Sequence, residues 1–395
     1  MRAVGIVAEY NPFHNGHAYH LAEAKKRSGA EIAVAVMSGW FTQRGDAAVL
    51  PPRVRAEAAL KCGADAVFLL PACWAVRDAE HFALAGVSLL ERLGCDALSF
   101  GVETDDLLRL QAVASVLEDE PEAFREELRG ALDKGMPHPQ AVAEAADVVI
   151  PGAAAVLREP NNTLAICYLR ALHRLNSAMT PVPVPRLGQY RDPNLHPAHP
   201  SATAMRLALW EGREADALQA LPGAAADVLT DALADGWLQP PEALDRPLRA
   251  RLLTMTEADW AALPGRSEGV EDRLRKAARQ TAPREAMLTL AGTRRYTHAR
   301  LNRMLTHALL GVTQEDLDAA LLPPAACLLG LNAGAAPLLR RAQENGLPVI
   351  GKAADWKAWR DQPWVRIEER AADLWSVGAG KPAGLMYSQG MAKGL

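Results

Sequence analysis

The sequence predicts an α/β fold built around a parallel sheet, and three observations point to it. Short apolar runs recur in the first hundred residues, at positions 4–8, 32–37, 66–70 and 97–100. Segments with helical spacing, such as 52–62 and 82–93, separate these runs, and strands that alternate with helices are typical of parallel sheets. Three of the four runs end in turn residues, so we expect their carboxyl ends to face one crevice, where such sheets bind ligands.

The first strand, turn and helix follow one another directly. Asn11 and Pro12 come after the first apolar run and predict a turn, since proline fixes φ and disfavours helix in the residue before it. From His17 the apolar positions have helical spacing, and the cations at 25–27 favour a helix that ends there. The helix N-terminus, with its unpaired N–H groups and partial positive charge, is therefore expected beside His14 and His17.

The stretch His14-Asn15-Gly16-His17 predicts a binding site for a nucleotide triphosphate. Gly16 lets a nucleotide approach the backbone closely, and imidazoles can donate hydrogen bonds to phosphoryl oxygens as charge develops on a leaving pyrophosphate. Two histidines in a loop are also found as plain solvated side chains, and the four residues alone leave that alternative open. The strand, turn and helix around them favour the phosphate site.

The middle of the chain is expected to be mainly helical. After Glu103 helices run to about Ala146, and Asn161-Asn162-Thr163 suit the N-cap of a further helix over 164–175. The alternate prolines of 181–185 exclude a central strand and allow only an edge strand. Helical spacing returns at 201–210.

The remainder of the chain predicts a helical bundle and then a return to α/β structure. The alanine-rich segment 211–282 is expected to form the bundle. Strands are expected at 325–331 and 348–350, with a helix at 337–345 between them. From Gly378 onward the sequence predicts a loose tail.

The composition indicates a globular protein and argues against several other classes of protein. With 395 residues, 49% hydrophobic and 23% charged, the chain is typical of globular proteins with two or three domains. Its five cysteines form no CxxC pair, which argues against a disulfide framework or a zinc site. The absence of a signal sequence and of an apolar run of about 18 residues predicts a cytoplasmic protein without a membrane partner.

One segment is strongly basic although the formal net charge is −4. Between Arg273 and Arg303 nine Lys or Arg residues stand against a single acid, Glu285, which leaves a local charge of +8. Such a run is often only a solvated helix face. Here Tyr296 and His298 can stack on bases, so RNA is an equally good partner.

Several motifs occur in a fixed order and together resemble one family. They are Gly5 to His17, Met37-Ser38-Gly39, Gln43-Arg44-Gly45-Asp46, Arg55-Ala56-Glu57, Phe100-Gly101-Val102-Glu103, Pro160-Asn161-Asn162, Arg186-Leu187-Gly188, Ser201 to Arg206 and Arg295 to Leu301. On these residues the chain resembles the tRNA(Met) cytidine acetate ligase family, a branch of the HIGH-motif nucleotidyltransferases. The resemblance covers nearly the whole chain.

The resemblance implies a fold and a reaction. The fold is an N-terminal Rossmann-like HIGH-type nucleotidyltransferase core with a parallel sheet (1–210), a helical, basic, tRNA-binding region (211–310) and a small C-terminal α/β subdomain (311–395). Members of the family form acetyl-adenylate from acetate and ATP and transfer the acetyl group to the exocyclic amine of the wobble cytidine of elongator tRNA(Met), which gives N4-acetylcytidine. Mg²⁺ is expected to bind through the phosphates, without a protein metal site.

The resemblance also assigns site residues. Those expected to bind ATP are Val7, Ala8, Glu9, Tyr10, Asn11, Pro12, Phe13, His14, Asn15, Gly16, His17, Ala18, Tyr19, His20, Gly101, Asn161, Asn162, Arg186, Leu187, Ser201 and Thr203. Catalytic roles fall to His14, His17 and Arg206. Those expected to bind tRNA are Arg273, Lys276, Arg294, Arg295, Arg300 and Arg303.

Each assignment has a plainer alternative. Ser201, Thr203 and Asn161 suit helix caps, Gly101 suits a turn, and Arg186 suits an exposed surface. Four residues depart from those expected at their positions in the family: Trp40, Pro51, Pro52 and Pro200. They bear on two features that the resemblance implies, the loop that faces the RNA and the pocket that holds the acyl group. The rival functions are a metabolic nucleotidyltransferase that adenylylates or cytidylylates a small phosphorylated molecule, and a non-catalytic RNA-binding protein that keeps a nucleotide pocket.

Overall fold

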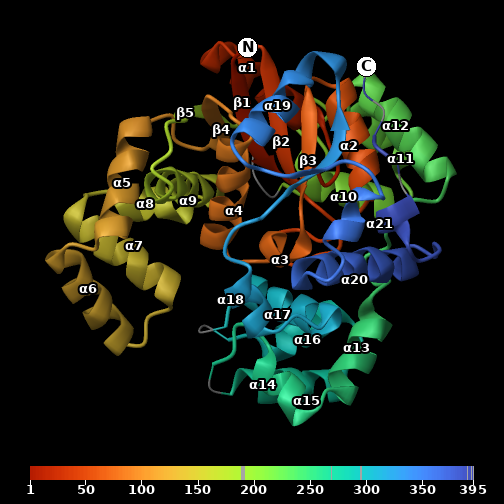
Figure 1. Cartoon of the computed structure of the whole chain (residues 1–395). Helices are drawn as coiled ribbons and strands as arrows, with labels where there is room; N and C mark the ends of the chain where they lie inside the picture. Colours follow the sequence, from red (N-terminus) through yellow and green to blue (C-terminus); the bar gives the residue numbers. More distant parts are fainter. Residues whose placement is uncertain (188–191, 268, 294–295, 389, 393, 395) are drawn as a thin grey trace.

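The centre of the molecule is one seven-stranded sheet (Figure 1). The computed structural model describes residues 1–187, 192–267, 269–293, 296–388, 390–392 and 394. Its strands are β1 Ala3–Ala8, β2 Ile32–Ser38, β3 Ala66–Leu70, β4 Ala97–Val102, β5 Thr180–Pro185, β6 Ala326–Leu331 and β7 Val349–Ile350. They lie in the order β5-β4-β1-β2-β3-β6-β7. The first five are parallel, β6 is antiparallel to β3, and β7 is parallel to β6, so the predicted α/β fold is confirmed.

Strand β5 lies at the edge of the sheet, as its prolines require. Within the described residues it pairs only with β4, with Thr180 opposite Ala97 and Pro185 opposite Val102. Proline has no N–H to donate, so alternate prolines are compatible with a strand that has a neighbour on one side only. The prediction of an edge strand is confirmed.

Helices cover both faces of the sheet. The first group consists of α1 Asn15–Ser28, α2 Pro52–Lys61, α3 Ala72–Ala75 and α4 Ala79–Arg92. Helices α1 and α2 share one apolar core with Ala33, Ala35 and Met37 of β2, whereas α4 shares another with Val34 and Val36. Burial on both faces explains why β2 is apolar at nearly every position instead of at alternate ones.

Two further groups of helices follow in the chain. The first forms a lobe beside the sheet, whereas the second begins with helices that share the core of α1 and α2 and continues into a separate lobe below the sheet (Figure 1). The first group is α5 Leu107–Asp119, α6 Glu122–Asp133, α7 His138–Val149, α8 Ala153–Arg158 and α9 Pro160–Arg174. The second is α10 Ala202–Trp210, α11 Glu214–Gln219, α12 Gly223–Ala234, α13 Asp245–Thr254, α14 Glu257–Ala262, α15 Val270–Gln280, α16 Arg284–Ala291, α17 His298–Leu310 and α18 Gln314–Ala319. The predicted helical character of both segments is confirmed. None of the helices in the described part of the chain is long and apolar enough to span a membrane.

The C-terminal part returns to the sheet. It comprises β6, β7, the 3₁₀ turns η1 Ala333–Ala335 and η2 Asp355–Ala358, and the helices α19 Pro337–Glu344, α20 Pro363–Gly378 and α21 Leu385–Ser388. Because β6 pairs with β3, this segment extends the N-terminal sheet. The domain boundaries at 210 and 310 stay a prediction.

The segment after Gly378 is better anchored than a loose tail. Leu385 in α21 is buried, and the backbone N–H of Ala392 donates to the carbonyl oxygen of Leu329 at 2.7 Å. The expectation of a loose tail is wrong for these residues, because it considered only the local glycines and not the apolar surface of β6 and α20 on which the tail packs.

A buried carboxyl joins α20 to the start of α3 and supports a pH-dependent prediction. Glu368 is fully buried, and its Oε2 accepts the N–H of Ala72 at 2.6 Å. Burial raises the pKa of this carboxyl to about 7. The folded protein therefore keeps the Glu368 proton up to about pH 7, whereas the unfolded chain releases it near the ordinary value of 4.5.

We expect Glu368→Gln to gain stability relative to the wild type as pH rises. The wild-type carboxyl contributes stability below about pH 4.5, and this contribution is lost as pH rises to about 7, a change on the order of 3 kcal/mol. Urea unfolding of both proteins at about pH 4.5 and pH 7.5 measures the difference. The exposed Glu126→Gln is the matched control; a wild-type-to-Glu368→Gln difference that is independent of pH would contradict the prediction.

Candidate nucleotide site

His14 caps helix α1 with its own side chain. Its backbone is extended, with φ −155° and ψ 175°, and its Nδ1 accepts the N–H of Gly16 at 3.1 Å. The helix therefore begins at Asn15 instead of His17. Because Nδ1 acts as an acceptor, the neutral ring of His14 carries its proton on Nε2 and has one N–H left to donate.

His17 stacks on the buried ring of His14. The two ring centroids are 3.7 Å apart, and Tyr10 and Phe13 lie against the ring of His17 at centroid distances of 4.9 and 5.7 Å. Burial lowers the pKa of His14 to about 3 and that of His17 well below its usual range. Both imidazoles are therefore neutral hydrogen-bonding groups at physiological pH.

One ring nitrogen of His17 is buried without a partner among the described residues. Nδ1 of His17 is buried and makes no hydrogen bond within the described parts of the chain. The next histidine of the helix differs, because Nε2 of His20 lies 3.0 Å from Oγ of Ser99 in β4. A buried polar atom without a partner is costly, so His17 is suited to a ligand atom in a way that His20 is not.

A second helix N-terminus lies beside the first. Ser201 caps α10, since its Oγ accepts the N–H of Ala204 at 3.0 Å and donates to the carbonyl oxygen of Asp192 at 2.6 Å. Nδ2 of Asn15 donates to the carbonyl oxygen of Pro197 at 2.9 Å, which holds the loop before α10 against the start of α1. Two partially positive helix ends thus converge on one place, an arrangement that favours an anion.

Arg206 connects α10 to the turn after β1. Its Nη1 donates to the carbonyl oxygen of Asn11 at 2.8 Å, and its Nη2 lies 3.4 Å from Oγ1 of Thr203. The positive charges of Arg186 and Arg206 both add to the burial that lowers the pKa of His14. The predicted catalytic residues His14, His17 and Arg206 are therefore brought together in one electropositive site.

Gly101 leaves open space at the end of β4. Alternation along the strand puts it on the same face as Ser99, which contacts His20 of α1. A Cβ at Gly101 would meet no heavy atom within 4 Å among the described residues. Arg186 continues the sheet next to it, with its N–H donating to the carbonyl oxygen of Val102 at 2.9 Å, and Leu187 is 40% exposed.

Asn161 and Asn162 lie inside the first turn of α9 and are not its N-cap. The helix begins at Pro160, and the carboxylate of Glu103 accepts the N–H groups of Asn161 at 3.2 Å and Asn162 at 2.9 Å. The N-cap prediction is wrong because the carboxylate of Glu103, the residue that follows β4, supplies the acceptor that a local cap would have supplied.

The two asparagines differ in what their side chains do. Asn162 is fully buried, and its Oδ1 accepts the N–H groups of Glu103 and Thr104 at 3.0 and 3.2 Å. Its Nδ2 donates to Oγ1 of Thr104 at 3.1 Å. Asn161 is only partly buried and donates to the carboxylate of Glu103. Of the two, Asn161 is the one exposed enough for a ligand contact.

The remaining residues of 7–20 frame the site. Val7 and Ala8 end β1, and Ala18 and Tyr19 belong to α1. The carboxylate of Glu9 accepts the N–H of Gln43 at 2.7 Å, and burial raises the pKa of Glu9 against the opposing charges of Arg206 and Arg44.

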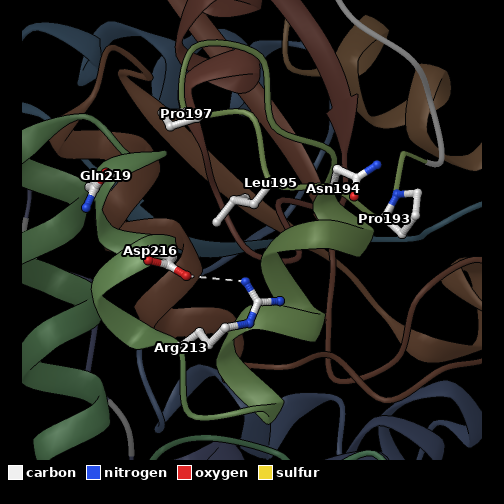
Figure 2. A pocket seen from close by; sticks show the side chains of 7 residues that line it. All are labelled: Pro193, Asn194, Leu195, Pro197, Arg213, Asp216 and Gln219. Carbon is white, nitrogen blue, oxygen red and sulfur yellow. Dashed lines mark hydrogen bonds and ion pairs between the residues drawn. The ribbon is translucent and has the colours of Figure 1, made fainter.

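A surface hollow of about 380 Å³ (Figure 2) lies near this site, because Pro197 in its lining accepts a hydrogen bond from Asn15. Its lining residues are Pro193, Asn194, Leu195, Pro197, Arg213, Asp216 and Gln219. Arg213 and Asp216 form an ion pair at 3.3 Å across it. Since no predicted ATP-binding residue lines this hollow, the helix ends at His14 and Ser201 remain the better candidate for a nucleotide.

The basic run divides into surface and internal residues. Arg273 and Lys276 are exposed on one face of α15, three residues apart, while Arg300 donates to the carbonyl oxygen of Gly265 at 2.8 Å and Arg303 is partly buried. Arg284 is internal and bonds to Asn302 Oδ1 at 2.6 Å. The predicted tRNA contacts Arg294 and Arg295 lie outside the described residues.

Comparison with known proteins gives the family. A family model described as HIGH Nucleotidyl Transferase matches residues 1–387. A protein of Syntrophotalea carbinolica named tRNA(Met) cytidine acetate ligase is 40% identical over 326 residues, which cover 82% of this chain and 77% of that protein. The chain belongs to the tRNA(Met) cytidine acetate ligase family of HIGH nucleotidyl transferases. The family and the enzyme class predicted from the sequence are thereby confirmed.

Other members of the family match the chain over its full length. The tRNA(Met) cytidine acetate ligase of Bacillus licheniformis is 35% identical over 400 residues, 98% of this chain and 95% of that protein. The crystal structure of apo Thermotoga maritima TmcAL superposes with a TM-score of 0.90 at 28% identity, covering 96% of this chain and 95% of that one. A second form of TmcAL, bound with alpha-thio ATP, has a TM-score of 0.88 at 27% identity, with the same coverage.

The departures from the family pattern have structural explanations. Trp40 is 3% exposed and packs on Trp375 of α20 at a centroid distance of 5.4 Å, so it faces the core. Pro51 and Pro52 stand at the N-cap and first position of α2, where proline costs no hydrogen bond. Pro200 is buried immediately before the N-cap Ser201.

Proposed function

We propose that the protein activates acetate with ATP and acetylates the wobble cytidine of elongator tRNA(Met). The observation that carries this proposal is the pair of stacked, neutral histidines at the meeting point of two helix N-termini, with Arg206 beside them. This arrangement suits a triphosphate, and the relatives named for the ligase and the neighbour bound with alpha-thio ATP support the same ligand for this chain. The name of these relatives gives acetate and a cytidine of tRNA(Met) as the groups that are joined, and we propose the same two substrates for this chain.

The first half reaction needs positioning and charge stabilisation but no protein nucleophile. A carboxylate oxygen of acetate attacks the α-phosphorus of ATP, the bond from that phosphorus to the bridging oxygen breaks, and pyrophosphate leaves as acetyl-adenylate forms. Negative charge develops on the leaving pyrophosphate. The Nε2–H of His14, the ring of His17, the guanidinium of Arg206 and the helix N-termini are the groups that would stabilise this charge.

The second half reaction transfers the acetyl group to RNA. The exocyclic amine of cytidine attacks the carbonyl carbon of the mixed anhydride, AMP leaves with the bonding electron pair, and the amine loses one proton to give N4-acetylcytidine. The exposed cations Arg273 and Lys276 on α15 are suited to the phosphates of the RNA. We also propose that Arg300 and Arg303 of α17 contact the same RNA.

Mg²⁺ fits this site only through the nucleotide. The described residues contain no cluster of three or more His, Cys, Asp or Glu side chains that could hold a metal ion. Mg²⁺ would therefore be bound by phosphate oxygens, where it would neutralise part of their charge.

Acetate-dependent ATP–pyrophosphate exchange by the purified protein tests the first half reaction. Exchange with acetate supports the proposal, exchange only with a phosphorylated metabolite supports a metabolic nucleotidyltransferase, and the lack of any exchange contradicts both enzymes. Addition of elongator tRNA(Met), followed by digestion and detection of acetylated cytidine, tests the second. If ATP, Mg²⁺ and acetate leave that nucleoside absent, the proposal fails.

A further inference from the structure

The loop of residues 42–46, which follows β2, has no role in the half reactions described above. We call it the junction loop. It is closed on itself, because the N–H of Thr42 donates to the carbonyl oxygen of Asp46 at 2.8 Å and the N–H of Gly45 donates to that of Thr42 at 2.9 Å. It contains Gln43-Arg44-Gly45-Asp46, one of the motifs on which the chain resembles the family.

One side of the junction loop is fixed to helix α17. Nδ2 of Asn302 donates to the carbonyl oxygen of Arg44 at 3.0 Å and to Oδ1 of Asp46 at 2.7 Å. Oγ1 of Thr306 donates to the carbonyl oxygen of Gly45 at 2.6 Å. Gly45 has φ +94°, and a Cβ there would lie 2.9 Å from the carbonyl oxygen of Asn302, so the close approach requires glycine.

The other side of the junction loop contacts the nucleotide site. The N–H of Gln43 donates to Oε1 of Glu9 at 2.7 Å, and Glu9 follows β1 directly. Nε2 of Gln43 donates to the carbonyl oxygen of Arg77, just before α4. The loop therefore joins the site of His14 and His17 to the helix that carries Arg300 and Arg303.

Arg44 places a positive charge at this junction. Burial raises the pKa of the Glu9 carboxyl, and the cations Arg206 and Arg44 oppose that rise. Burial also lowers the pKa of the Arg303 guanidinium. The positive charges of Arg44 and Arg300 lower this pKa further, whereas the negative charge of Asp78 raises it. The geometry agrees, because the carbonyl oxygen of Arg44 is bonded to Asn302, the residue before Arg303, and a Cβ at Gly45 would lie 3.1 Å from Cα of Arg303. Arg44 therefore lies between Glu9 and the N-terminal half of α17.

We infer that Arg44 is a positioning residue that, together with Arg303, binds a phosphate of the RNA strand that carries the acceptor base into the nucleotide site. The inference rests on the proposed function. The acetyl group is activated beside His14 and His17, so an RNA held on α15 and α17 has to pass the junction loop to reach it. Two neighbouring cations in a partly desolvated place repel each other, and a phosphate between them would relieve that repulsion through charge-assisted hydrogen bonds.

Arg44→Ala tests the inference, with Arg44→Lys and Arg125→Ala as companions. The bonds from Asn302 and Thr306 reach the loop at the carbonyl oxygens of Arg44 and Gly45 and at Asp46, so the substitution leaves these groups in place, and thermal unfolding checks that the variant folds. Arg125 is an exposed arginine on the distant α6 and matches the change in charge. The probes are acetate-dependent exchange without RNA, and binding and acetylation of an unmodified tRNA(Met) transcript.

We expect a split between the two half reactions. Exchange without RNA by Arg44→Ala should stay within about twofold of the wild type, while kcat/KM for acetyl transfer falls by about tenfold or more. The slope of log affinity for the transcript against log salt should decrease by about 0.7–0.9, the value of one phosphate contact. Arg44→Lys should recover most of the salt slope, because it keeps the charge, and Arg125→Ala should match the wild type.

Two results would overturn the inference. A parallel loss of exchange and transfer would put Arg44 in the nucleotide site alone, and an unchanged salt slope with unchanged transfer would leave it without an RNA contact. Failure of the proposed function is distinguishable, because the wild type itself would then show no acetate-dependent exchange. In that case the salt slope for the transcript still decides whether Arg44 binds RNA.

Discussion

Replacement of His17 by alanine is expected to abolish most adenylate formation and to leave RNA binding intact. The ring of His17 stacks on His14 at 3.7 Å, and its buried Nδ1 has no protein partner within the described residues. Loss of one preorganised group of this kind lowers turnover by roughly 100- to 1000-fold. Acetate-dependent ATP–pyrophosphate exchange measures the first effect, and affinity for a tRNA(Met) transcript measures the second.

The pH profile separates this role from one that needs a charged histidine. Because burial lowers the pKa of His14 to about 3 and that of His17 well below its usual range, wild-type exchange should show no imidazole titration between about pH 6 and pH 8.

The matched control for His17→Ala is His173→Ala, which removes an exposed histidine of α9. Exchange by His17→Ala within about threefold of the wild type would refute the assignment.

The second large effect is expected at Arg55, which holds the carboxyl ends of two strands. Its side chain is 1% exposed. It donates to the carbonyl oxygens of Leu50 and Ser38, both at 3.0 Å, and to those of Glu9 and Gly39. Burial lowers its pKa to about 9, so the guanidinium stays charged at neutral pH.

Arg55→Met should therefore lower the free energy of unfolding by about 3–5 kcal/mol, since it leaves buried carbonyl groups without a donor. Urea unfolding measures the loss. Arg53→Met is the matched control, because Arg53 lies in the same helix, is partly exposed and pairs only loosely with Glu57 at 3.9 Å. We expect less than about 1 kcal/mol for the control. Equal losses in the two variants would show that Arg55 has no special role.

The same residue marks a limit of sequence reasoning. The motif Arg55-Ala56-Glu57 is visible in the sequence, but the role of its arginine is not. The one available signal is an arginine amid the apolar positions of α2, where Val54, Ala56 and Ala59 are buried. Its four acceptors come from three separate segments, and no local pattern specifies that they meet.

Glu103 and Trp40 illustrate the same limit in different ways. Glu103 supplies the acceptors at the start of α9, which the sequence assigned to a cap formed by the asparagines themselves. Trp40 looked like a change in the RNA-facing loop, but it packs on Trp375, more than three hundred positions later in the chain. Both expectations depended on neighbours in space that are distant in sequence.

The sequence by itself determined the strands, most helices and the motif at His14 and His17. Apolar periodicity, proline and glycine act within a few residues, so these features are readable locally. Only the tertiary structure decided that the starts of α1 and α10 converge, that Arg206 reaches the turn at Asn11 and that the junction loop links α17 to Glu9. These contacts join segments up to about two hundred and sixty residues apart, and packing of the whole chain brings them together.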